Sequence, residues 1–113
     1  MKTKVSKVFY FDAAHKIVNH KGKCKNLHGH TYELIVTIEG EIESGMVIDF
    51  EDLKKVVDPV TKKYDHSYLN DFFENPTVEN IAIKILSEIQ KKTDKIVSVK
   101  LWEGRNNYAE VLP

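Results

Sequence analysis

The two ends of the chain alternate between apolar and polar residues, which is the pattern of strands with one buried face. Residues 2–12 alternate and are rich in valine, phenylalanine and tyrosine, as expected for a strand. Residues 30–39 alternate more clearly, and one face of this predicted strand collects Tyr32, Leu34, Val36 and Ile38. Residues 95–103 and 106–112 are predicted to form a closing antiparallel pair joined at Gly104.

The middle of the chain shows helical spacing instead. The first predicted helix opens at Asp49 or Phe50, and Pro59 is expected to kink or divide it because proline lacks a backbone donor. Its apolar stripe consists of Leu53, Val56, Val57 and Val60. The second helix begins at residues 75–77, with Thr77 as the N-cap. This order of elements predicts an α+β fold, in which a four-stranded antiparallel sheet carries two helices on one face.

Length and composition limit the classes of function. A chain of 113 residues fits one domain, residues 1–113, with a modest core, so part of a large binding pocket would have to come from a neighbouring subunit. The 17 Lys and Arg residues balance the 17 Asp and Glu residues, which argues against nucleic-acid or membrane-surface binding. Without a signal peptide, an apolar run of transmembrane length or a second cysteine, the chain is expected in the reducing cytoplasm.

The balanced charge is unevenly distributed along the chain. No acidic residue lies between Ala13 and Tyr32, whereas that window holds four lysines and four histidines. Such a window suits a polyanionic ligand such as a phosphate ester. The alternative is a solvated lysine loop, which is what most charge runs are.

Three histidines in this window form a candidate metal site. His28 and His30 are two positions apart, so both imidazoles of an extended segment project from one face, while Gly29 leaves the other face bare. His15, just past the end of the first predicted strand, is the natural third ligand. Three histidines with an open fourth position are typical of catalytic zinc. Ordinary strand histidines are the alternative, because the His-x-His pattern alone is common.

Cys24, four positions before His28, has three interpretations. It could be a small buried apolar residue, or a fourth ligand that closes a Cys-His₃ structural site. In the third interpretation the thiol lies near the metal without binding it, and local positive charge lowers its pKa so that it acts as a catalytic base. The residues alone leave this choice open.

Two other positions carry candidate chemistry. Asp65 and His66 fit either a helix C-terminus with a cation on its last turn, or a proton carrier oriented by a carboxylate whose identity stays open. Glu103 continues the apolar alternation of residues 97–101, where a carboxylate needs a partner such as the paired donors of a heterocycle edge. Alternatively, the strand has ended there and Glu103 is solvated.

Six blocks occur in order along nearly the whole chain. They are F-x-A-A-H at 11–15, C-x-x-x-H-G-H at 24–30, G-M-V-I-D-F-x-D-L-K at 45–54, D-H-x-x-L-N at 65–70, N-P-T-x-E-N at 75–80 and Glu103. Together they resemble the family of 6-pyruvoyl-tetrahydropterin and 6-carboxy-tetrahydropterin synthases, most closely the 6-carboxy type of queuosine biosynthesis. Two departures are Tyr64, where leucine is expected, and the short linker between Asn70 and Asn75. Both concern the rim of the pocket more than its chemistry.

The resemblance implies a tunnelling fold, in which the sheets of several subunits join into a barrel. It implies a homo-oligomer, expected to be a hexamer, with active sites at subunit interfaces. It also implies roles for the candidate residues: zinc (Zn²⁺) bound by His15, His28 and His30, Cys24 as catalytic base, Asp65 and His66 as a proton relay from a neighbouring subunit, and Glu103 as the anchor of the pterin ring.

The implied substrate is 7,8-dihydroneopterin triphosphate, whose triphosphate suits the lysine window. The implied enzyme is a carbon-carbon lyase that releases 6-carboxy-5,6,7,8-tetrahydropterin, acetaldehyde and triphosphate, in a route to the 7-deazapurines queuosine or archaeosine. The three residues between Cys24 and His28 resemble the carboxy type. The alternatives are 6-pyruvoyl-tetrahydropterin synthase activity on the same substrate and a zinc-stabilised binding domain without catalysis.

Overall fold

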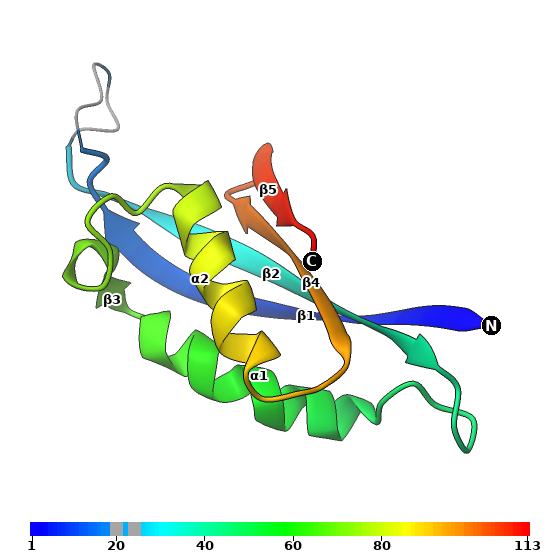
Figure 1. Cartoon of the computed structure of the whole chain (residues 1–113). Helices are drawn as coiled ribbons and strands as arrows, with labels where there is room; N and C mark the ends of the chain where they lie inside the picture. Colours follow the sequence, from blue (N-terminus) through cyan, green and yellow to red (C-terminus); the bar gives the residue numbers. More distant parts are fainter. Residues whose placement is uncertain (19–21, 23–25) are drawn as a thin grey trace.

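The computed structural model of the protein describes residues 1–18, 22 and 26–113. Its longest strands are β1 (Lys2–His15) and β2 (His28–Glu41), which pair antiparallel over their full length. Strand β4 (Ile96–Glu103) pairs antiparallel with β2, and β5 (Asn107–Val111) pairs antiparallel with β4 (Figure 1). These four strands confirm the antiparallel sheet that the alternation predicts.

A fifth strand, β3 (Ser67–Tyr68), was not predicted. It runs parallel to β1, with Ala13 opposite Ser67, and makes a mixed sheet in the order β3-β1-β2-β4-β5. The expected four-stranded, wholly antiparallel sheet is therefore wrong at this edge. Two residues are too few to show a period, so the pattern of apolar residues held no signal for β3.

Both helices lie on one face of the sheet. Helix α1 (Phe50–Tyr64) packs along β1, and α2 (Val78–Gln90) packs along β4 and β5. Each begins at a capping side chain: Asp49 accepts a hydrogen bond from the Glu51 amide at 2.7 Å, and Thr77 accepts one from the Asn80 amide at 3.2 Å. Helix α1 runs without a break through Pro59, so this proline does not divide the helix.

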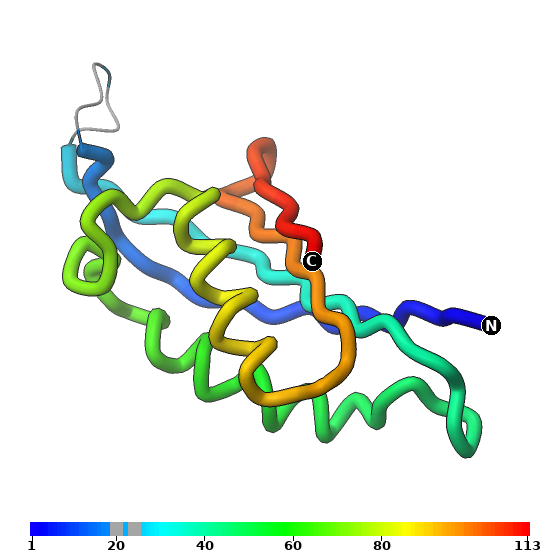
Figure 2. The backbone as a smooth tube through the Cα atoms, viewed as in Figure 1, coloured from blue at the N-terminus to red at the C-terminus, as the bar shows by residue number. Residues whose placement is uncertain are grey.

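The short 3-10 helix η2 (Leu69–Asp71) connects β3 to the segment before α2. No helix within the described ranges has both the length and the apolar character needed to cross a bilayer. Figure 2 shows the two helices on the same side of the strands, with the N-terminal end of β1 projecting beyond them.

The core fills the space between the sheet and the helices. The predicted stripe of β2 is buried there, since Tyr32, Leu34, Val36 and Ile38 are each at most 1% exposed. The alternate residues of the sheet lie on the opposite face, which no helix covers. Tyr10 of β1 and Tyr108 of β5 are exposed there. The two ends of the β1–β2 ladder therefore differ in burial. His15 continues the buried face of the ladder at one end only.

Candidate active site

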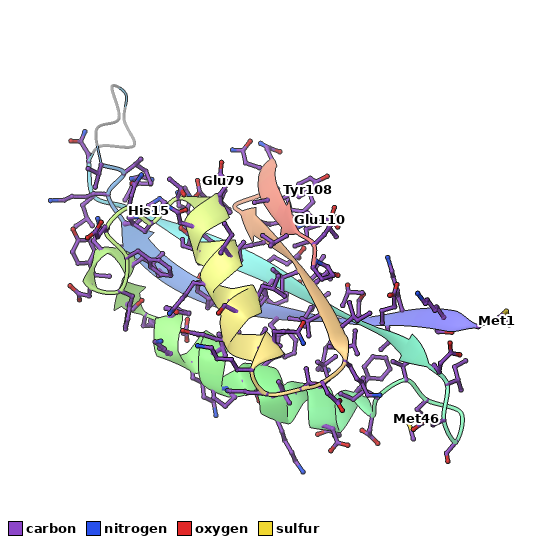
Figure 3. The ribbon with its side chains drawn as sticks, viewed as in Figure 1. Met1, His15, Met46, Glu79, Tyr108 and Glu110 are labelled. Carbon is purple, nitrogen blue, oxygen red and sulfur yellow. The ribbon has the colours of Figure 1, made fainter. Side chains whose placement is uncertain are left out.

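Three histidines converge at the end of the β1–β2 ladder. His15 lies opposite His28, and Ala13 lies opposite His30, so all three imidazoles project from the face that the helices cover. Their ring centroids are 4.5 to 5.0 Å apart, and the candidate ligand nitrogens lie within 4.8 Å of one another. The predicted grouping of these residues is confirmed. Figure 3 labels His15 beside the start of α2.

Backbone carbonyls orient two of these rings. His15 Nδ1 lies 2.8 Å from the Pro76 carbonyl oxygen, and His28 Nδ1 lies 2.7 Å from the Asn26 carbonyl oxygen. A carbonyl only accepts, so each Nδ1 carries the proton, and each Nε2 of a neutral ring presents a lone pair. The two Nε2 atoms are 3.0 Å apart. Two lone pairs at this distance repel each other unless a cation lies between them or beside them.

His30 supplies the third nitrogen of the cluster. Its Nε2 is buried and has no hydrogen-bond partner in the described part of the chain. The Glu103 Oε1 atom lies 3.5 Å away, too far for a well-formed hydrogen bond. A buried nitrogen without a partner carries a free-energy cost that a metal ion would remove. The three histidines therefore fit a metal ion, with backbone oxygens holding two of the ligands in place.

Burial also sets the protonation of these ligands. It lowers the pKa of His15, against the Pro76 carbonyl, which acts in the opposite direction. It likewise lowers the pKa of His30, against the nearby charge of Glu103. Metal ions bind the neutral imidazole, so burial favours the form that a ligand needs.

Glu103 ends β4 beside this cluster. It lies opposite Tyr32 in the ladder, and its side chain is only 19% exposed. The alternative of a fully solvated strand end does not describe this position. Its carboxylate faces His30, at the border between the metal cluster and solvent.

Asp65 and His66 form a second cluster, directly after α1. Asp65 Oδ1 accepts a hydrogen bond from the Asp12 amide at 2.9 Å, and its Oδ2 lies 2.9 Å from His66 Nδ1. The Asp12 amide first, and His66 second, lower the pKa of Asp65. The carboxylate that orients His66 is therefore Asp65, its neighbour in the sequence. Asp65 is also the C-cap of α1, so the two interpretations of this pair are compatible.

The backbone holds His66 in an unusual conformation. Its φ angle is 57°, in the left-handed region that residues with a Cβ rarely adopt. The His66 amide donates to the Asp12 carbonyl at 2.6 Å, and β3 pairs with β1 immediately afterwards. The imidazole, 82% exposed, is thereby displayed at the sheet edge. Strained conformations of this kind persist where surrounding contacts fix them, often at functional sites.

The two clusters border the same cavity. His66 and His30 both line this open cavity of about 520 Å³, together with Asp12, Ala14, Gly29 and Thr31. Within residues 1–18, 22 and 26–113, no hydrogen bond or ring contact joins His66 to the three histidines. Gly29 lies on the face of β2 opposite to His28 and His30, as its position between two histidines predicts.

Cys24 lies outside the described residues, as do three of the four lysines of the acid-free window. Its role as a base, and the contact of these lysines with a phosphate, stay predictions. The carbonyls of Asn26 and Pro76 were not foreseen, because any residue can supply a backbone oxygen and the sequence therefore gives no signal for it.

Comparison with known proteins identifies the family. The family described as 6-pyruvoyl tetrahydropterin synthase matches residues 4–113. The chain belongs to this family. A Pyrococcus furiosus protein named dihydroneopterin monophosphate aldolase is 47% identical over 107 residues, covering 92% of each chain. The 6-carboxy-5,6,7,8-tetrahydropterin synthase of Haemophilus influenzae is 36% identical over 136 aligned positions, covering 95% of this chain and 96% of that one.

The fold agrees with the family. The structure of Caenorhabditis elegans 6-pyruvoyl tetrahydropterin synthase superposes with a TM-score of 0.90 and 29% identity, covering 100% of this chain and 96% of that one. The predicted tunnelling-fold subunit is confirmed by this match.

Proposed function

We propose that this protein is a zinc-dependent 6-carboxytetrahydropterin synthase. It converts 7,8-dihydroneopterin triphosphate into 6-carboxy-5,6,7,8-tetrahydropterin, acetaldehyde and triphosphate, in a route to 7-deazapurines. The observation that carries the proposal is the convergence of three histidine nitrogens, one of them buried without a partner, in a chain of this family. The Haemophilus influenzae relative of that name supports the choice of reaction.

The metal site is proposed to hold zinc through the Nε2 atoms of His15, His28 and His30. Three imidazoles with an open fourth position are the ligand set of catalytic zinc. Zinc bound there supplies Lewis acidity to the oxygens of the substrate side chain. Glu103, which lies 3.5 Å from His30, is proposed to accept the paired N–H donors of a pterin ring.

Proton transfer is assigned to Cys24 and His66. The Cys24 thiolate is proposed to remove a proton from a side-chain carbon, a role that rests on the resemblance of the C-x-x-x-H-G-H block to the family. His66 directs Nδ1 at Asp65, which leaves Nε2 to exchange protons with the substrate. The lowered pKa of Asp65 keeps its carboxylate ionised at neutral pH, so it holds the imidazole in one tautomer.

A neighbouring subunit is proposed to bring the two clusters together. Within the described part of one chain, His66 lines the same open cavity as His30 but has no hydrogen bond or ring contact with the three histidines. A chain of 113 residues leaves this cavity open, and a second copy beside the sheet edge would close it; we therefore propose a homo-oligomer, expected to be a hexamer. Mixing inactive Cys24→Ala with inactive His66→Ala under subunit exchange should restore part of the activity. A mixture that exchanges subunits but stays inactive would place each complete site in one chain.

A second candidate is dihydroneopterin monophosphate aldolase activity. The observation that favours it is the 47% identity with the Pyrococcus furiosus protein of that name over nearly the whole chain. Both reactions cleave a carbon-carbon bond of a pterin side chain, and they differ in the phosphate that the substrate carries.

Mass spectrometry of the products separates the candidates. The zinc-loaded protein is incubated in parallel with 7,8-dihydroneopterin triphosphate and with the monophosphate, using His28→Ala as the inactive control. Formation of 6-carboxytetrahydropterin and acetaldehyde from the triphosphate is the expected result. A 6-pyruvoyl product, or cleavage of the monophosphate alone, would overturn the proposal in favour of the corresponding alternative. No turnover of either substrate by zinc-loaded protein would favour the binding domain.

A further inference from the structure

Two asparagine side chains hold the chain where it leaves β1. Asn70 Oδ1 accepts a hydrogen bond from the Lys16 amide at 2.8 Å, and Asn70 Nδ2 donates to the Lys16 carbonyl at 3.0 Å. Asn75 Oδ1 accepts from the Val18 amide at 3.0 Å. These backbone groups lie beyond the end of the sheet ladder, so the asparagines give them the partners that a strand would otherwise supply.

The same segment also holds the ring of His15. The Pro76 carbonyl accepts from His15 Nδ1 at 2.8 Å, and the His15 side chain is fully buried. The Tyr32 hydroxyl is the other neighbour of this nitrogen, at 3.4 Å. Asn70, Asn75 and Pro76 thus contact three of the four residues from 15 to 18. The chain immediately after a metal ligand is therefore fixed by side chains from the distant β3–α2 connection.

The segment that carries Asn70 and Asn75 is itself anchored to α2 and to the core. The Asn75 carbonyl accepts from Asn80 Nδ2 at 2.9 Å and from the Thr77 amide at 2.9 Å. Asn70 follows Leu69, which is fully buried. Because these contacts tie the segment to α2 and to the core, a displacement of Lys16 or Val18 would break hydrogen bonds to the asparagines.

We propose that Asn70 and Asn75 are positioning residues of the metal centre, which hold His15 ready to bind the ion. His15 is the last residue of β1, and strand ends open more easily than strand centres. A ligand that must be ordered upon binding lowers affinity, whereas a ligand that is already ordered does not. The inference rests on the zinc site proposed above. It extends that site to two residues that contact no ligand nitrogen.

The two asparagines use their amides differently, which provides a matched test. Asn70 both accepts and donates, so Asn70→Asp places a carboxylate oxygen against the Lys16 carbonyl and should fail like Asn70→Ala. Asn75 contacts Val18 only through its accepting oxygen. Asn75→Asp should therefore restore what Asn75→Ala loses. Asn106→Ala, at an exposed asparagine in the β4–β5 turn, is the control.

The measurement is the zinc dissociation constant, by competition with a chromophoric chelator, beside the thermal midpoint of each metal-free variant. Residues that support metal ligands typically change affinity by 10- to 100-fold, so Asn70→Ala, Asn70→Asp and Asn75→Ala should weaken zinc binding about tenfold. Asn75→Asp and the control should stay close to wild type. A merely structural role would lower the thermal midpoints and leave zinc affinity unchanged.

The outcomes are distinguishable from a failure of the proposed function. If the wild type binds zinc and the three variants bind it equally well, the positioning role is wrong and the zinc site stands. The positioning role is also wrong if Asn75→Asp loses as much affinity as Asn75→Ala. If the wild type binds no zinc, both the site and the inference drawn from it are overturned.

Discussion

Replacing His30 with alanine separates metal binding from folding. In the metal-free protein its Nε2 is buried without a partner, and its side chain is 25% exposed. Removing that nitrogen relieves a cost of about 1 to 3 kcal/mol, which offsets a packing loss of similar size. The midpoint of the metal-free variant should therefore stay within a few degrees of the wild type. In the presence of zinc, the midpoints of the variant and the wild type should differ much more.

The size of the zinc effect follows from mass action. Zinc at 100 times its dissociation constant stabilises the folded state by about 2.7 kcal/mol. The unfolding entropy of a 113-residue chain is about 0.24 kcal/mol/K, so the wild-type midpoint should rise by about 11 °C. Loss of a ligand weakens binding by at least about 100-fold, which leaves about 0.4 kcal/mol, or roughly 2 °C.

Scanning calorimetry of chelator-treated protein, with and without zinc, measures both quantities. His66→Ala is the matched control, because it removes an exposed histidine outside the cluster and should keep the full zinc-induced rise. If zinc raised the midpoint of His30→Ala as much as that of the wild type, His30 would not be a ligand. Its buried nitrogen would then need another explanation.

Three further predictions concern pH, the proton relay and ring recognition. Burial lowers the pKa of His15 and His30, so below the unfolded histidine value of about 6.5 the unfolded chain binds more protons than the folded chain. The stability of the metal-free protein should therefore be retained above that pH and lost as the pH falls through the folded pKa values. Urea midpoints measured at different pH values would show this loss. Asp65→Asn puts an amide donor where the carboxylate meets His66, and should lower kcat by about 100-fold without changing the zinc-induced rise; equal kcat in steady-state assays would refute the relay. Glu103→Gln should weaken binding of a pterin without phosphates by about 2 to 4 kcal/mol in titration calorimetry, and an unchanged affinity would mean that another group holds the ring.

The sequence predicts features that repeat with a period and misses those that do not. The buried face of β2 follows from strict alternation, and the grouping of His28 with His30 follows from the same period of two. The two residues of β3 show no period, and so the mixed edge of the sheet was missed. At Pro59 the missing donor is tolerated inside α1, where Val57 and Val60 remain buried on either side.

The site is less predictable than the fold because its geometry depends on the backbone. The contact of His66 with Asp65 accompanies a left-handed φ angle at His66, and a backbone angle at one position leaves no pattern in the sequence. The cavity that His66 shares with His30 lies beside the sheet edge that β3 creates, and the sequence pattern did not predict this edge. Cys24, the residue whose role the sequence left most open, lies outside the described residues.

The pairing of β1 with β2 also determines whether the metal cluster exists at all. Successive side chains of a strand point to opposite faces, so a slip of one residue in this ladder would turn His15 away from His28 and His30. Only the correct register presents all three nitrogens to one ion. An ion that binds this cluster would therefore select the native register from among the slipped ones. Metal supplied during refolding should then act as a check on strand alignment, before any substrate is present.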